Sequence, residues 1–404
     1  MQKKANFVPV KHKLTNMPTK IITIREDDTE IRMFENQYPV PHGMSYNSHM
    51  LIGGGRNAIL NSVDFRCVAD WLETIFNTLP AGQSVDYFVI QHVEPDHGGG
   101  IEQLLHVFPG AKVVASDKAL RMLADFHPSL DLEGRTVVVK DGDILPLGES
   151  DDDVLRFIAA PMVHWPEVMM AYHPATATLF SADAFGTFGA VNSYDEEPWP
   201  DEARRYYCNI VGKYGAQVKT VLACIDHLDI RCIKPIHGHD LSAPLDSYID
   251  LYKKWSSYTP ELPEGVLVAY SSVYGATAKA AGVLAEALRR RGREVCLVNL
   301  NRTDASEALA QAFRMGSAVF ASITYDGGVM PSMRDLLSRL VSKGWRGRRV
   351  GFIQTGSWAP VAAKVMHDML APCKDLVFSD CTVTIHSSVQ DTDISAIESL
   401  AESL

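Results

Sequence analysis

Short continuous runs of apolar residues alternate along the chain with longer segments in which apolar residues recur every three or four positions. The short runs are typical of buried strands, and the longer segments are typical of helices that pack on a sheet. Residues 87–90 and 112–115 show the first pattern, and residues 64–79 and 118–126 show the second. The alternation of these patterns predicts an α/β protein.

The pattern starts afresh after residues 256–264, a segment that contains two prolines and resembles a linker. Beyond it, strand and helix patterns alternate regularly, which predicts a doubly wound parallel sheet. The expected strands lie near residues 266–270, 294–298, 317–322, 349–354 and 377–385. We therefore expect a first domain at 1–255, a linker at 256–264 and a second domain at 265–404.

The apolar run at 87–90 leads into a segment with four potential metal ligands in six residues: His92, Glu94, Asp96 and His97. Four donors so close together exceed the need of one ion and suit two neighbouring ions. Imidazole and carboxylate without thiolate favour iron, manganese or zinc. The alternative is a surface loop with chance histidines and carboxylates that cap a helix.

Three later apolar runs also end in a candidate ligand, namely His164, Asp183 and His237. We expect each at the carboxyl end of a strand, where sites in α/β folds gather. A single such residue is more often a core or capping group, but the set forms a candidate metal site together with the segment at 92–97. His239 competes with His237 for the last position.

Three loops of the second domain are candidate cofactor-binding loops. The first opens a helix and is rich in hydroxyl groups, so its backbone N–H groups suit a phosphate. The other two supply aromatic surface and glycines for a flat isoalloxazine ring, and none contains a dinucleotide fingerprint. FMN is therefore the predicted ligand, and the alternative is a helix start with only its own cap. The candidate residues are Ser271, Ser272, Val273, Tyr274, Gly275, Ala276, Thr277, Ser322, Thr324, Tyr325, Asp326, Gly327, Gly356, Ser357 and Trp358.

Composition narrows the functional classes. The 404-residue chain has a net charge of −11, which gives no electrostatic support for nucleic-acid binding. Its seven cysteines include no C-x-x-C pair, which argues against a disulfide framework and indicates a reducing compartment. No apolar stretch approaches the roughly 18 residues of a membrane span, and no secretory leader is recognisable. We expect a cytoplasmic protein without a membrane partner.

Two groups of arginines stand out in the second domain: Arg289, Arg290, Arg291 and Arg293, and Arg346, Arg348 and Arg349. They predict either a basic face for an acidic protein partner or a solvated helix end and loop.

Taken together, these residues resemble the flavodiiron proteins, also called A-type flavoproteins, over roughly residues 28–390. The family pattern is H-x-E-x-D-H, then a histidine, then an aspartate after 18 intervening residues, then a histidine before glycine, and the chain matches it throughout. The resemblance implies a metallo-β-lactamase-like αββα sandwich followed by a flavodoxin-like domain. It implies one iron bound by His92, Glu94 and His164, a second bound by Asp96, His97 and His237, and Asp183 as the bridging carboxylate. His237 is favoured over His239 because a glycine follows it.

Two details refine the comparison. Glu94 stands where hydrolases of this superfold usually carry histidine, which favours an iron pair over two zincs. The second flavin loop has Ile323 and Asp326 where the family usually carries proline and asparagine, and the third loop is less glycine-rich. We expect these changes to alter the FMN potential or the partner surface.

The resemblance implies an oxidoreductase in which electrons pass from FMN to a di-iron site that reduces O2 to water, NO to N2O, or both. The metal ligands are shared by both activities, and we expect O2 as the main substrate. The resemblance also implies a head-to-tail homodimer or a dimer of dimers. Without paired C-x-x-C ligands the chain has no rubredoxin module, so we expect a separate donor such as rubredoxin or a flavin reductase. The alternatives are NO reduction as the main role, a zinc-dependent hydrolase, and an electron carrier with a degenerate metal site.

Overall fold

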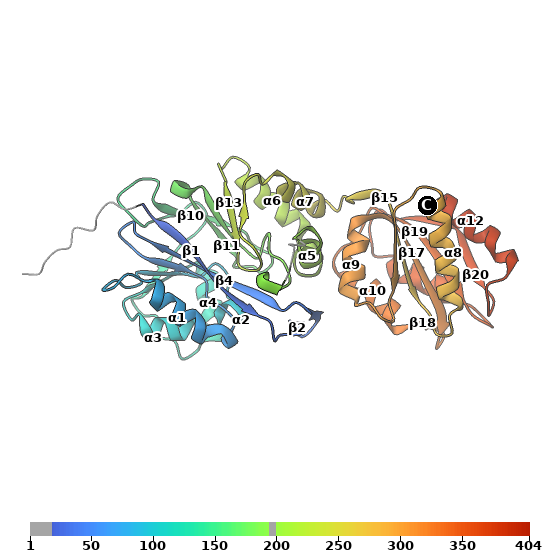
Figure 1. The fold of residues 1–404 in the computed structure, drawn as a ribbon, viewed down its shortest axis with the longest axis horizontal. Helices are drawn as coiled ribbons and strands as arrows, with labels where there is room; N and C mark the ends of the chain where they lie inside the picture. Colours follow the sequence, from blue (N-terminus) through green and yellow to red (C-terminus); the bar gives the residue numbers. More distant parts are fainter. Residues whose placement is uncertain (1–17, 194–198) are drawn as a thin grey trace, which may run out of the picture. The chain divides into compact units, whose positions relative to one another are not determined.

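The computed structural model describes residues 18–193 and 199–404 (Figure 1). Contact density divides the chain into two compact units. The first comprises the described part of residues 1–26 with 46–159 and 169–180, and the second comprises 27–45, 160–168 and the described part of 181–404. Among the described residues, no helix combines the length and apolar character that a membrane crossing needs.

A six-stranded sheet begins the first unit, with the strand order β1-β4-β5-β6-β7-β8. Its strands are β1 (Lys20–Asp28), β4 (Met44–Ile52), β5 (Ala58–Leu60), β6 (Tyr87–Val89), β7 (Lys112–Ala115) and β8 (Thr136–Val138). The glycines at 53–55 join β4 and β5 in an antiparallel hairpin. From β5 to β8 the strands are parallel, and the short apolar runs predicted most of them.

Four antiparallel strands face this sheet across an apolar core. They are β9 (Ile144–Pro146), β10 (Val154–Ala159), β11 (Met169–His173) and β12 (Thr178–Ala182). Leu60 and Val89 from the first sheet pack in one cluster with Phe157 and Phe180 from the second. Complete burial of each such side chain contributes about 1.5–3 kcal/mol. The result is the β-sandwich expected of a metallo-β-lactamase-like domain.

Helices cover the outer side of the first sheet, as the periodic segments predicted. They are η1 (Phe65–Cys67), α1 (Val68–Thr78), α2 (Pro95–Gly98), α3 (Ile101–Val107) and α4 (Asp117–Phe126). Val68, Trp71 and Ile75 form the buried stripe of α1, at the spacing of one helix face. Ser116 begins α4 because its Oγ accepts a hydrogen bond from the Ala119 N–H at 3.1 Å.

The second unit contains helical segments that the sequence analysis did not predict. Its elements up to residue 256 are β2 (Met33–Phe34), β3 (Tyr38–Pro39), η3 (Val191–Ser193), α5 (Trp199–Tyr206), the π-helical turn η4 (Tyr207–Val211), η5 (Gly212–Tyr214), α6 (Gly215–Ile225), β13 (Cys232–Pro235), β14 (Leu241–Ser242) and α7 (Asp246–Ser256). η2 (Pro174–Thr176) belongs to the first unit. α6 packs against α7, and β13 pairs antiparallel with β14.

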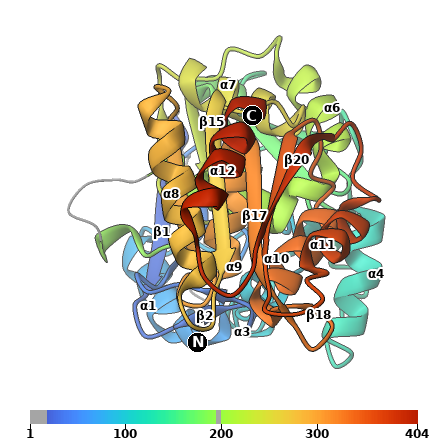
Figure 2. The same ribbon diagram turned by 90° about the vertical axis from the view of Figure 1, so that its right-hand side faces the viewer.

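A five-stranded parallel sheet completes the second unit in the order β16-β15-β17-β19-β20, with the short strand β18 beside β17. The strands are β15 (Leu262–Ser271), β16 (Val295–Asn299), β17 (Met315–Tyr325), β18 (Gly328–Val329), β19 (Arg349–Thr355) and β20 (Val377–Ile385). The helices are α8 (Ala276–Arg290), α9 (Ala305–Arg314), α10 (Pro331–Ser342), α11 (Ala362–Leu370) and α12 (Asp391–Ser403). α8 packs beside α12 in front of the sheet in Figure 2, and α10 packs beside α9 and α11. The predicted doubly wound sheet is confirmed.

Candidate functional site

The first group of predicted ligands lies on the loop between β6 and the one-turn helix α2. The buried side chain of Gln91 fixes this loop, because its Nε2 donates to the carbonyl oxygens of Met169 and Phe180, both at 3.0 Å. Its Oε1 accepts a hydrogen bond from Asn61 Nδ2 at 2.9 Å. Pro95 then opens α2, where a missing backbone N–H has no cost. These contacts fix the start of the ligand loop against both sheets.

The four ligand side chains of this loop contact one another in pairs. His92 Nε2 lies 3.1 Å from Glu94 Oε2, and His97 Nε2 lies 3.4 Å from Asp96 Oδ2. Both imidazoles are fully buried, with ring centroids 6.2 Å apart. The loop thus presents two imidazole–carboxylate pairs side by side.

Asp183 directly follows β12, as predicted, and has a histidine beside each of its carboxylate oxygens. His164 Nε2 lies 3.8 Å from Oδ2, and His237 Nε2 lies 3.7 Å from Oδ1. His237 Nδ1 donates to the Ser45 carbonyl oxygen at 2.8 Å, so its Nε2 keeps the lone pair that faces Asp183. Tyr206, which the sequence did not single out, donates its hydroxyl hydrogen to Oδ1 at 2.8 Å.

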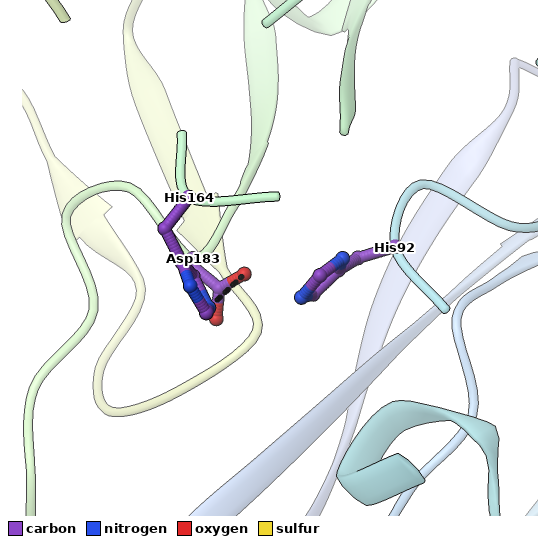
Figure 3. Close-up of side chains that lie close together, drawn as sticks. All are labelled: His92, His164 and Asp183. Carbon is purple, nitrogen blue, oxygen red and sulfur yellow. Dashed lines mark ion pairs between the residues drawn. The ribbon is translucent and has the colours of Figure 1, made fainter. Parts of the chain in front are cut away.

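Six of the seven predicted ligands form two compact groups. The ligand atoms of His92, His164 and Asp183 lie within 4.8 Å of one another, and Figure 3 shows these side chains pointing toward one another. The ligand atoms of the second group, Asp96, His97 and His237, lie equally close together. Glu94 lies beside the first group through its contact with His92. In the described part of the chain, the second group contains His237 and not His239.

The prediction that His164 ends a strand was wrong. β10 ends at Ala159, and the chain then reverses, with the Ala160 N–H donating to the Val168 carbonyl oxygen at 3.0 Å. Met162 adopts a positive φ of 65° within this reversal. His164 therefore lies on a tight turn that an apolar run conceals.

The three predicted flavin loops lie side by side, because they follow three adjacent parallel strands. Ser271 of β15 is paired in register with Ser322 of β17, and Ile323 of β17 is paired with Thr355 of β19. The carboxyl ends of these strands meet at one edge of the sheet, where ligands of doubly wound folds bind.

Several hydroxyl groups of these loops are already hydrogen-bonded within the protein. Ser271 Oγ donates to Ser322 Oγ at 3.2 Å, and both residues are buried. Thr277 and Thr355 share a buried hydrogen bond of 2.7 Å. Thr324 Oγ1 accepts from the N–H groups that begin α11. These hydroxyls fix the loops relative to one another.

The outer residues of the loops are open to solvent. Tyr274 is 96% exposed, Trp358 is 83% exposed and Tyr325 is 44% exposed. Gly275 precedes α8 with a φ of +93°, and no side chain caps this helix start. Uncapped N–H groups at a helix N-terminus beside exposed aromatic rings suit a phosphate and a flat ring.

The predicted basic face is largely neutralised by neighbouring carboxylates. Arg290 and Arg291 both pair with Glu398, and Arg291 also pairs with Glu402. Buried Arg348 instead donates to backbone carbonyl oxygens, which include that of Tyr258. Burial lowers the Arg348 pKa to about 10. These contacts favour the second interpretation of the arginines, a helix end and a loop, over a basic face for an acidic protein partner.

Solved structures share this fold over almost the whole chain. Rubredoxin oxygen:oxidoreductase from Desulfovibrio gigas aligns with a TM-score of 0.85, 23% identity and 95% coverage of both chains. The flavodiiron protein from Giardia intestinalis aligns with a TM-score of 0.87 and 23% identity, covering 99% of this chain and 97% of that one. The fold and the site geometry define a protein with a metallo-β-lactamase-like domain and a flavodoxin-like sheet.

Sequence relatives extend the comparison. Residues 44–238 match the family described as ODP family beta lactamase. The chain is 27% identical to the anaerobic nitric oxide reductase flavorubredoxin of Aeromonas hydrophila over 347 residues, which cover 83% of this chain and 68% of that one. The Escherichia coli flavorubredoxin is 26% identical over 83% of this chain and 71% of its own length. The chain is thus similar in sequence to the flavorubredoxins and in fold to the flavodiiron protein of Giardia intestinalis.

Proposed function

We propose that the protein is an oxidoreductase that reduces O2 to water, NO to N2O, or both, at a non-haem di-iron site supplied with electrons through FMN. The observation that carries this proposal is the pair of ligand groups, with a histidine on either side of the Asp183 carboxylate. Two neighbouring sets of imidazole and carboxylate donors without thiolate suit a pair of iron ions.

The described side chains fit such a pair. His92, Glu94 and His164 would bind one ion and Asp96, His97 and His237 the other, while each Asp183 oxygen would face one of them. The hydrogen bonds from Tyr206 to Asp183 and from His237 to Ser45 would orient these ligands, as partners behind metal ligands usually do. The bound irons would supply redox chemistry and a place for the gas.

The loop surfaces at the edge of the second sheet fit FMN. Ser272, Gly275 and Ala276 would approach the phosphate at the start of α8, and Tyr274 and Trp358 would flank the ring. The buried hydroxyl pairs between the loops would hold the cradle in shape. FMN would supply electrons, and the protein would position it and tune it.

The electron count is consistent with this set of cofactors. Reduction of O2 to two waters takes four electrons, and FMN with two irons can store four. Among the relatives, the flavorubredoxins are named for NO and the Desulfovibrio gigas protein for O2. We propose O2 as the preferred gas, a rubredoxin or flavin reductase as the donor, a head-to-tail dimer or dimer of dimers, and a cytoplasmic location.

The test is anaerobic purification with metal and flavin analysis, followed by O2 and NO consumption with a reduced rubredoxin as donor. Two irons and one FMN per chain with rapid gas uptake are expected, and the ratio of the two rates identifies the preferred gas. Two zincs, bound flavin and no gas uptake would refute the proposal and favour the hydrolase alternative.

A further inference from the structure

A cluster of tyrosine and tryptophan rings extends from the candidate metal site. Tyr252, Trp255, Tyr207 and Trp199 are buried, and Tyr248 is partly exposed. Tyr248, Tyr252 and Trp255 follow one another on α7 at the spacing of a single helix face. Trp199 begins α5, and Tyr207 belongs to the π-helical turn that follows it. The cluster therefore joins two helical segments about 50 residues apart in sequence.

One end of the cluster lies beside Asp183. The Tyr252 ring stacks on Phe185, two residues after Asp183, with centroids 4.1 Å apart. The Phe185 N–H donates to the Tyr252 hydroxyl. Tyr252 is thus an oxidisable side chain next to the proposed iron site.

The rings beyond Tyr252 form a continuous series of contacts. Its centroid lies 5.3 Å from that of Trp255 and 5.2 Å from that of Tyr207. Trp255 stacks on Trp199 at 6.2 Å, and Trp199 meets Tyr248 edge to face at 4.6 Å. Trp255 Nε1–H donates to the Glu261 carboxylate at 2.7 Å, which stabilises positive charge on the indole.

Tyrosine and tryptophan are the aromatic side chains that lose an electron most readily, and contact between rings favours transfer from one to the next. A core built only for packing would have no need of four such residues in series, since phenylalanine and leucine fill space equally well. The series instead leads from a site of oxidising chemistry to the partly exposed Tyr248.

We propose that Tyr252, Trp255, Trp199 and Tyr248 form an electron path that delivers single electrons from the surface to the metal site when FMN cannot supply all that gas reduction requires. The proposal rests on the proposed function. For each electron that the site receives from Tyr252, Trp255 reduces Tyr252, Trp199 reduces Trp255, and Tyr248 reduces Trp199. Tyr248 ends one electron short and releases its phenolic proton to water. A thiol then returns one electron and one proton to Tyr248, and two such events join two thiols in a disulfide.

The path protects the protein, because an oxidised intermediate that is not reduced at the metal site would oxidise the side chains that bind the metal. Tyr248 is the exchange point, since a small thiol can reach it and cannot reach the buried rings. The reductant that the path requires is therefore a low-molecular-weight thiol.

The test uses the iron-loaded, FMN-containing protein, mixed with O2 under limiting reductant and frozen rapidly for electron paramagnetic resonance. Tryptic mass spectrometry then locates oxygen added to aromatic residues. The interrupting variant is Trp199→Phe, because in the described part of the chain the Trp199 Nε1–H donates no hydrogen bond that the substitution would remove. Trp71→Phe is the control, because Trp71 is also buried, lies on α1 outside the cluster, and in the described part of the chain has no indole hydrogen bond to lose.

The unmodified protein should show an aromatic radical and oxidation at Tyr248, both diminished by glutathione. Trp199→Phe should lose the Tyr248 oxidation and inactivate faster under limiting reductant, with an unchanged rate under excess reductant. Trp71→Phe should behave as the unmodified protein. Gas uptake without an aromatic radical, or equal Tyr248 oxidation in Trp199→Phe, would overturn the path and leave the proposed function intact. If neither gas is consumed, the proposed function fails. Hydrogen peroxide is then added to the iron-loaded protein, and the aromatic radical and the oxidation of Tyr248 show whether the electron path exists. Failure to bind iron overturns both.

Discussion

Replacing Asp183 by asparagine should have opposite effects on the metal-free and metal-loaded protein. The carboxylate is 1% exposed, and the His164 and His237 Nε2 atoms lie 3.8 Å and 3.7 Å from it. Burial of a carboxylate charge costs several kcal/mol after relaxation, and metal ions bound beside Asp183 would offset that cost. Without metal, removal of the charge should therefore stabilise the fold.

The size of the effect follows from the contacts. Asparagine removes the charge but keeps an oxygen for the Tyr206 hydroxyl, so only about 1 kcal/mol of that hydrogen bond is lost. The metal-free variant should be more stable by about 1–3 kcal/mol, the difference between the burial cost and this loss. In a chain of this length that corresponds to a rise in Tm of about 1–4 °C. Metal affinity should fall by more than about 100-fold, because loss of partners behind a ligand alone costs roughly 10–100-fold.

Scanning calorimetry at about pH 8, with chelator and with anaerobically added iron, measures both effects. Asp153→Asn is the matched control, because buried Asp153 accepts hydrogen bonds from Thr19 and from His173 Nε2. It should be destabilised by about 1–3 kcal/mol with or without metal. A metal-free Asp183→Asn variant that melts at or below the unmodified metal-free protein would refute the reasoning.

Three further predictions concern single residues. His237→Asn should lose about half of the bound metal and reduce gas uptake by at least roughly 100-fold. His239→Asn should keep its metal content and its rate of gas uptake, and metal analysis and an oxygen electrode measure the two quantities. Gly275→Ala should weaken FMN binding roughly 5–30-fold, because φ is +93° and a Cβ there costs about 1–2 kcal/mol of backbone strain although it meets no atom within 4 Å. Flavin fluorescence measures the release. Burial lowers the pKa of His173, so the unfolded chain takes up its proton first, and stability should fall as the pH drops below about 6.5. His173→Gln should flatten this loss between about pH 7.5 and 5.5 in urea denaturation.

Local patterns were sufficient for the features that depend on neighbours in sequence. Asp183 follows a buried strand, and the first ligand loop follows another, so both were visible as apolar runs that end in ligands. The carboxyl ends of adjacent parallel strands must meet, which placed the three flavin loops together before their contacts were known. For these elements, periodicity and chain direction determine the geometry.

Features that depend on tertiary contacts were missed. The turn at His164 carries the apolar residues of a strand, and hydrogen bonds such as that from Ala160 to Val168 show that the chain reverses. Tyr206 is 23 residues from Asp183, a separation that carries no periodic signal. Trp199 of α5 contacts Tyr248 and Trp255 of α7, which the sequence of either helix alone does not reveal.

The segment expected to be a linker is bound to the fold, and this determines how the protein can be divided. Leu262–Glu264 belong to β15, and Glu261 accepts hydrogen bonds from Trp255 and from Arg204 Nη2 at 2.7 Å. The Tyr258 carbonyl accepts a hydrogen bond from buried Arg348. A fragment cut at residue 265 would shorten a central strand and remove an acceptor from a buried guanidinium, at about 1–3 kcal/mol for that group. Proteases should therefore spare this joint, and an isolated flavin-binding half should begin at about residue 257 to fold well.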